Sequence, residues 1–140
     1  MRYMILLTYD EKQAVPPDER LINEMGMFNA RLEKAGVLRA GEGLVASDHG
    51  ARVTVTDDKR TVVDGPFAES KELVAGFWIL DVSGLEEAVE WARRVPNPQP
   101  GRSATLEVRR VVEAEDLGDA FAPEARAAEE RMRARLAELD

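Results

Sequence analysis

The carboxylate of Asp64 is the side chain in this sequence best placed for acid–base chemistry. It stands directly before Gly65 and Pro66, where an apolar segment ends and the chain is forced to turn, because a residue before proline avoids the α region and proline donates no backbone hydrogen bond. A carboxylate held at such a turn can act as a general base or bind a polar ligand. The alternative is that Asp64 accepts hydrogen bonds from its own turn, as aspartate commonly does.

His49 is a second candidate catalytic residue, because it is the one imidazole in the chain. Imidazole exchanges protons readily near neutral pH, so His49 paired with Asp64 would make an acid–base couple. The residues around it, Ser47 to Gly50, are polar and typical of a loop. The alternative is therefore that His49 is a solvated loop residue.

Four further charged residues are candidates for binding a ligand: Glu42, Glu69, Lys71 and Arg109. Glu42 lies between two glycines, and it would be a functional carboxylate if it points into the protein, but means little if it points outward. Lys71 could hold an anionic substrate or pair with Asp64, and Glu69 could supply a second carboxylate. A solvated charged connection is the alternative for both. Arg109 could pair with Glu42 or anchor an anion.

The sequence argues against a metal or a cofactor. It has no cysteine and one histidine, which excludes thiol catalysis, cysteine-ligated zinc and sites that need several imidazoles. The segment from Gly41 to Ala46 fits the glycine pattern of dinucleotide sites, but no helical pattern opens there as that motif requires. We interpret these glycines instead as a bulge or a close approach of two backbones.

Length and charge limit the class of protein. A chain of 140 residues is the size of one domain. Its net charge of −8 at pH 7 argues against nucleic acid and anionic membrane surfaces as partners. No stretch reaches the length of a membrane span, and the apolar run at the beginning is too short for an export signal. We therefore expect a cytoplasmic protein.

Hydrophobic periodicity predicts the elements that must position these side chains. Strands are predicted over 3–9, 37–44, 73–82 and 104–112, a hairpin over 52–63 with its turn at 57–60, and helices over 16–35, 85–95 and from 123 onward. The spacing of Ser83 and Glu86 predicts a capping box at the second helix. Without the hairpin and the last helix, this order is the ferredoxin-like βαββαβ arrangement of the α+β class.

The two helices within this arrangement each have a single apolar stripe, so both must cover the same face of an antiparallel sheet. The other face is then left open, although the strands over 3–9 and 73–82 are apolar on both sides. A large exposed apolar face predicts a partner, and the simplest partner is a second copy related by a two-fold axis. We therefore expect a homodimer formed through the open sheet face.

The segment Asp64-Gly65-Pro66-Phe67-Ala68-Glu69-Ser70-Lys71-Glu72 resembles the YCII-related family, and more narrowly the subgroup named for its Asp-Gly-Pro-Phe motif. The resemblance extends over about residues 1–119 and leaves 120–140 as a C-terminal helical extension. Further matching segments are Met1-Arg2-Tyr3-Met4, Ala35-Gly36-Val37-Leu38, Gly41-Glu42-Gly43-Leu44, Ala75-Gly76-Phe77-Trp78, Leu85-Glu86-Glu87-Ala88-Val89-Glu90-Trp91 and Leu106-Glu107-Val108-Arg109.

This resemblance implies a dimeric α/β barrel built from ferredoxin-like subunits. It implies no particular reaction, because most of the family has no assigned activity. The family's proposed catalytic histidine has no counterpart at His49, which lies outside the matching segments. The first functional hypothesis is a small-molecule-binding barrel with cofactor-independent acid–base chemistry around Asp64. The alternative is a non-enzymatic regulatory or interaction module, since some members are encoded with, or fused to, extracytoplasmic-function sigma factors.

Overall fold

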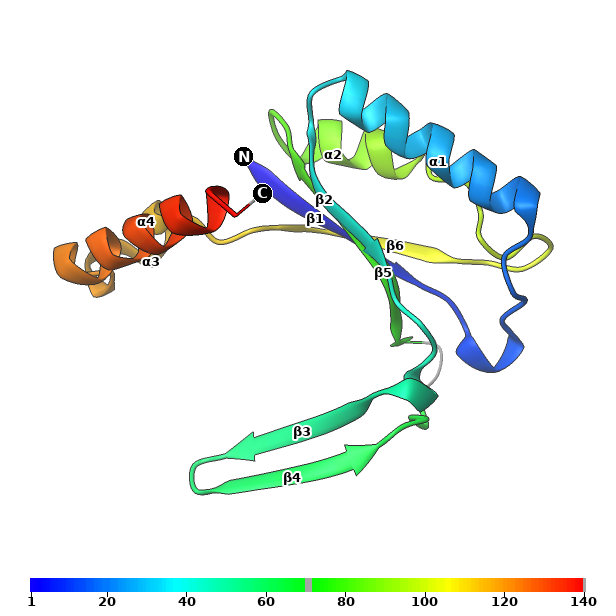
Figure 1. Cartoon of the computed structure of the whole chain (residues 1–140), viewed down its shortest axis with the longest axis horizontal. Helices are drawn as coiled ribbons and strands as arrows, with labels where there is room; N and C mark the ends of the chain where they lie inside the picture. Colours follow the sequence, from blue (N-terminus) through cyan, green and yellow to red (C-terminus); the bar gives the residue numbers. More distant parts are fainter. Residues whose placement is uncertain (70–71, 140) are drawn as a thin grey trace. The chain divides into compact units, whose positions relative to one another are not determined.

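The computed structural model in Figure 1 describes residues 1–69 and 72–139. It divides into two compact units, Met1–Arg110 and Val111–Asp140, and each unit is described by itself below. One predicted ligand-binding residue, Lys71, lies outside the described residues.

The first unit is built on a four-stranded antiparallel sheet with the strand order β2-β5-β1-β6. Its strands are β1 (Arg2–Thr8), β2 (Leu38–Gly43), β5 (Val74–Asp81) and β6 (Thr105–Arg110). Strands β1 and β5, the first and third of the βαββαβ arrangement, lie in the centre of the sheet. Strands β2 and β6, the second and fourth, lie at its edges. This is the topology of the ferredoxin-like arrangement, so the predicted α+β fold class is confirmed.

Helices α1 (Glu19–Lys34) and α2 (Leu85–Ala92) both cover one face of this sheet (Figure 1). Asp18 caps α1, where its side chain accepts a hydrogen bond of 2.9 Å from the N–H of Leu21. The capping box predicted at α2 is wrong. Gly84 occupies the cap position and has no side chain to accept a hydrogen bond, so Ser83 stands one residue too early.

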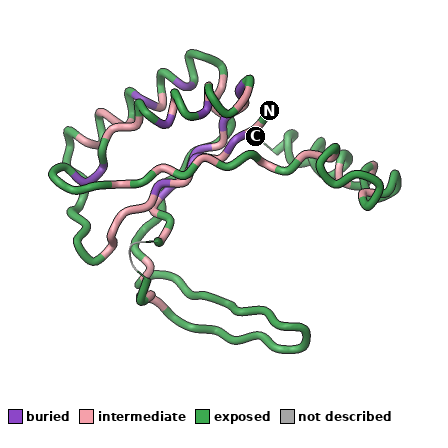
Figure 2. The backbone as a smooth tube through the Cα atoms, turned by 180° about the vertical axis from the view of Figure 1, so that it is seen from behind, coloured by how far each residue is buried: buried purple, intermediate pink, exposed green. Residues whose placement is uncertain are grey.

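The core lies between the helices and the sheet, where every second residue of the central strands is buried (Figure 2). The sheet contributes the fully buried side chains of Ile5 and Leu80, and α1 contributes those of Phe28 and Leu32. The ring of Phe28 meets the ring of Trp78 edge to face, with centroids 5.7 Å apart. The predicted apolar stripe of the first helix therefore does face the sheet.

The inserted hairpin consists of β3 (Ala51–Thr56) and β4 (Lys59–Asp64), and all of its residues are exposed. The strands pair only with each other and form a separate two-stranded sheet. Its turn is shorter than predicted, because Lys59 and Arg60 already pair with Thr56 and Val55. Two residues, Asp57 and Asp58, are left to connect the strands.

The second unit contains a short helix α3 (Ala114–Leu117) and the longer helix α4 (Pro123–Ala137). The predicted C-terminal helix is therefore present and begins at the predicted proline. Its exposed surface carries ion pairs one turn apart, among them Arg133–Glu129 at 2.8 Å. Within the described residues, none of the helices combines the length and the apolar character needed to cross a membrane.

Candidate functional site

The turn around Gly65 is attached to the sheet through Ser47. The Ser47 hydroxyl donates a hydrogen bond to the carboxylate of Glu11, which also accepts the Ser47 backbone N–H. The same hydroxyl oxygen accepts the N–H of Phe67 at 3.3 Å, and the N–H of Gly65 donates to the carbonyl of Gly50 at 2.9 Å. Glu11 lies three residues after the end of β1 at Thr8, so this network connects the base of the hairpin to the segment that follows a central strand.

Gly65 has no side chain because the backbone of Ser47 occupies the space. A Cβ atom at Gly65 would lie 1.7 Å from the Ser47 carbonyl oxygen and 2.6 Å from its carbon. Both of these atoms belong to the backbone, so no side-chain rotation can relieve the clash. The glycine of the Asp-Gly-Pro-Phe segment is thus explained by packing. Sequence reasoning missed Glu11 and Ser47, both of which stand in polar segments without any periodic pattern.

Asp64 is the last residue of β4, opposite Ala51 in the register of the hairpin, and its side chain is exposed. Among the described residues, none donates a hydrogen bond to its carboxylate. The N–H groups of Gly65 and Phe67, which a turn-capping aspartate would bind, go instead to Gly50 and Ser47. The carboxylate faces solvent, and its role in catalysis stays a prediction.

His49 has Asp48 as its partner, with the imidazole Nδ1 at 2.9 Å from a carboxylate oxygen. The His49 side chain is 68% exposed and that of Asp48 is 58% exposed. A contact this open to water contributes little to stability or orientation. Within the described part of the chain, the structure thus places His49 beside Asp48, and no hydrogen bond or ion pair joins His49 to Asp64.

Glu69 lies beside Arg52 of the hairpin, at 3.3 Å between Nη1 and a carboxylate oxygen. The guanidinium of Arg52 also lies over the ring of Phe67, 4.1 Å from its centroid. A hydrogen bond from its own backbone N–H, and then the hydrogen bond and charge of Arg52, lower the pKa of the Glu69 carboxyl. Glu69 therefore remains a carboxylate at neutral pH and suits charge recognition better than proton donation.

Glu42 and Arg109 lie on the sheet face opposite the helices, but at different edges. The register places Glu42 of β2 opposite Phe77, Phe77 opposite Leu6, and Leu6 opposite Glu107 of β6. Three interstrand spacings separate β2 from β6, which is about 14 Å. Glu42 and Arg109 of one chain therefore do not pair. Arg109 forms an ion pair with Glu107 instead, at 3.1 Å.

A cavity of about 150 Å³ lies at the β2–β5 edge, and Glu42 is part of its lining. Asn29 of α1 also lines it and accepts a hydrogen bond of 2.8 Å from the indole N–H of Trp78. A Cβ atom at Gly41 would lie 3.0 Å from the Trp78 ring, and one at Gly76 would lie 3.1 Å from the carbonyl oxygen of Glu42. The close approach of two backbones predicted for Gly41 and Gly43 is wrong, because the close neighbour of Gly41 is a side chain and a Cβ atom at Gly43 would meet nothing within 4 Å.

The Glu42 cavity combines features that suit a small polar molecule. A carboxamide and an indole, from Asn29 and Trp78, meet there beside the apolar side chains of Leu7 and Met25 on the helix-covered side of the sheet. The register turns the side chain of Glu42 to the opposite face, so its place in the lining is that of its backbone. Sequence reasoning found Glu42 from its flanking glycines but missed Asn29, because an asparagine within a helix gives no signal of its own. Within residues 1–69 and 72–139, no group of three or more histidine, aspartate and glutamate side chains is gathered closely enough to hold a metal ion.

The sheet topology and this cavity define a ferredoxin-like α+β protein with a small concave site at one sheet edge. Residues 1–115 match the YCII-related domain, and the chain belongs to the YCII-related family. It is similar to an uncharacterized protein of Rhizobium meliloti (strain 1021), with 32% identity over 113 residues that cover 78% of this chain and 90% of that protein. The predicted family is confirmed, and the narrower Asp-Gly-Pro-Phe subgroup is compatible with the match.

Proposed function

We propose that this protein binds a small molecule in the cavity beside Glu42, and that it does so as a homodimer whose open sheet faces cover each other. The observation that carries the proposal is the cavity itself, where the amide of Asn29 and the indole of Trp78 lie together at the sheet edge beside the backbone of Glu42. A concave site with a few polar groups among apolar ones is the usual form of a small-molecule site.

The open sheet face supports the dimer. Its centre is apolar, because Met4 and Leu6 of β1 lie opposite Ile79 and Phe77 of β5. These four side chains are only half-buried, since both helices cover the other face. A sheet with two apolar faces is completed by a second layer, and a second copy provides that layer through a self-complementary surface.

Acid–base chemistry by Asp64 is a separate part of the proposal, because Asp64 does not line the cavity beside Glu42. Its carboxylate is exposed and accepts no hydrogen bond among the described residues, so its oxygens are available to take a proton from a molecule bound at the turn. His49 is the weaker candidate because Asp48 is its partner. A reaction of this kind needs no cofactor, since proton transfer is its only step.

Amide NMR spectra recorded during screening of a fragment library test the binding site. We expect bound fragments to shift the amides of Asn29, Gly41 and Gly43, and Asn29→Ala to weaken their binding. Asn23→Ala is the matched control, because Asn23 is the same residue type on the exposed surface of the same helix and does not line the cavity. If the fragments that bind shift other regions, or if the two variants bind equally, the site is wrong.

A non-enzymatic interaction module is the second candidate function, and the exposed hairpin favours it. Val53, Val55 and Val62 are between 58% and 64% exposed, and the register places all three on one face of the hairpin. A surface of this kind suits a protein partner better than water. The association with sigma factors rests on the family resemblance alone. Recovery of the full chain without any bound protein, together with a measured turnover, would exclude this function.

A further inference from the structure

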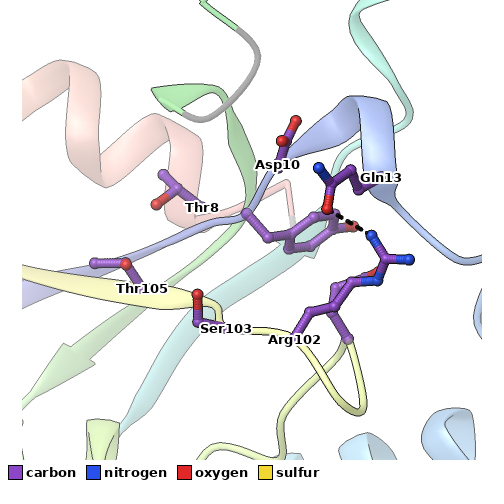
Figure 3. Close-up of a pocket in the computed structure, with 8 residues that line it drawn as sticks. Thr8, Asp10, Gln13, Arg102, Ser103 and Thr105 are labelled. Atoms are coloured by element: carbon purple, nitrogen blue, oxygen red, sulfur yellow. Dashed lines mark hydrogen bonds between the residues drawn. The ribbon is translucent and has the colours of Figure 1, made fainter.

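A second and larger cavity, of about 360 Å³, lies where β1 ends and β6 begins (Figure 3). Its lining comes from three short segments: Thr8, Tyr9, Asp10 and Gln13; Gln99, Arg102 and Ser103; and Thr105. None of these residues belongs to the candidate site beside Glu42 or to the turn that contains Asp64. The cavity therefore goes beyond the function proposed above and calls for a separate explanation.

Arg102 is the cationic group of this cavity, and its partner is a neutral side chain. Its Nη1 donates a hydrogen bond of 2.7 Å to the amide oxygen of Gln13 (Figure 3). Within the described residues, Arg102 forms no ion pair with a carboxylate, whereas Arg39, Arg52 and Arg109 each lie within 3.6 Å of one. A guanidinium has five N–H donors, so Arg102 keeps donors and positive charge available for an anion.

Hydroxyl groups face the same cavity from the sheet. Thr8 and Thr105 lie directly opposite each other in the β1–β6 pairing, and Ser103 precedes β6 in the loop that contains Arg102. Each hydroxyl can both donate and accept a hydrogen bond. Together they form a polar wall beside the guanidinium, which suits a ligand that carries hydroxyl groups as well as a negative charge.

Asp10 limits the charge that such a ligand can carry. Its carboxylate lines the cavity and also accepts the backbone N–H of Lys12 at 3.1 Å. A dianion such as phosphate would be repelled by this carboxylate, whereas a hydroxyl group of a ligand can donate a hydrogen bond to it. The lining therefore combines one site for a carboxylate with several sites for hydroxyl groups.

We propose that this cavity binds a small hydroxy-carboxylate, with its carboxylate on Arg102 and its hydroxyl groups on Ser103, Thr8, Thr105 and Asp10. Planar pairing of a guanidinium with a carboxylate provides the affinity and fixes the orientation. The hydroxyl contacts select against simple fatty acids of the same size, which would leave these polar groups unpaired.

Amide NMR spectra of the full chain test this assignment with gluconate as the probe, at millimolar concentration and constant ionic strength. We expect localized shifts at Gln13, Ser103 and Thr105. Sorbitol, which has the same carbon chain without the charge, should cause no such shifts, and inorganic phosphate should bind more weakly. Arg102→Met should weaken gluconate binding by at least about tenfold, because it removes a charge-assisted pair.

Arg93→Met is the matched control, since it removes an equal charge from an exposed position at the C-terminal end of α2, where Arg93 lies 3.9 Å from Glu90. Ser103→Ala provides a second variant in case Arg102→Met fails to fold, and it should also weaken binding. The proposal is overturned if gluconate causes no localized shifts, if phosphate binds equally well, or if Arg93→Met weakens binding as much as the cavity variants. Each of these results leaves the Glu42 cavity and its own test unaffected.

Discussion

Replacing Gly65 with alanine should open the base of the hairpin. The added Cβ atom would lie 1.7 Å from the Ser47 carbonyl oxygen, and this separation must grow to at least 3.0 Å before real atoms can be accommodated. A displacement of that size breaks the hydrogen bonds from Gly65 to Gly50 and from Phe67 to Ser47. We expect a loss of about 2–4 kcal/mol in the local free energy of opening, from two neutral hydrogen bonds and weakened contacts of Ser47 with the charged carboxylate of Glu11.

Amide hydrogen exchange measures this effect where it occurs, because the Gly65 and Ser47 amides become exposed only when the hairpin base opens. Protection of both amides should fall by at least about tenfold, while the amide of Ile5 in the core changes much less. Gly50→Ala is the control, since its added Cβ atom would meet the same Ser47 carbonyl oxygen at 3.6 Å, an ordinary contact. Equal protection in wild type and Gly65→Ala, or equal losses in the two variants, would refute the packing argument.

Three further predictions concern other parts of the first unit. Arg52→Met should raise the pKa of Glu69 toward its ordinary 4.5, because the charge of Arg52 and its hydrogen bond help to lower it. Because the pKa of Glu69 is lowered in the folded protein, its carboxylate stabilises the fold at pH values above the ordinary carboxyl pKa, and this stabilisation is lost as the pH falls. If the NMR titration of the Glu69 carboxyl is unchanged in the variant, the pairing with Arg52 is wrong. Leu6→Lys should give a monomer by light scattering, because Leu6 lies on the open sheet face through which we expect the two copies to pack. If the wild-type protein is already a monomer at micromolar concentration, the proposed dimer is wrong. Gln99→Ala should cost about 1–3 kcal/mol in urea unfolding, because the buried Gln99 side chain bonds both backbone groups of Val15, and an unchanged midpoint opposes this.

The fold was largely predictable from the sequence, because its long elements carry clear periodic patterns. The apolar stripe of α1 is one example, where Phe28 and Leu32 are buried at the predicted spacing. The errors lie at the ends of elements. Ser83 has the right residue type for a helix cap, but the helix begins one residue later, and only the backbone path determines that position.

The candidate sites were less predictable, because a site depends on which separate segments meet. The flanking glycines drew attention to Glu42, although neither of them marks the close approach of two backbones that the pattern predicted. Nothing in the sequence indicated that Asn29 lines the same cavity, or that Arg102 would face Thr8 and Thr105 across another. These contacts join residues that are far apart along the chain, and a single sequence carries no information on such pairs.

The turn from Asp64 to Phe67, which carries the family resemblance, contains residues that packing requires and one residue, Asp64, that packing does not require. Gly65 is required by the Ser47 carbonyl oxygen, and Phe67 is held by the Ser47 hydroxyl and by Arg52. Asp64 has no comparable contact among the described residues, so packing gives no reason for a carboxylate there. Asp64→Asn should therefore leave amide protection at Gly65 unchanged, unlike Gly65→Ala. If the same variant alters the binding or turnover of a small molecule, the change arises from the carboxylate itself, whereas a loss of protection would show that Asp64 has a structural role.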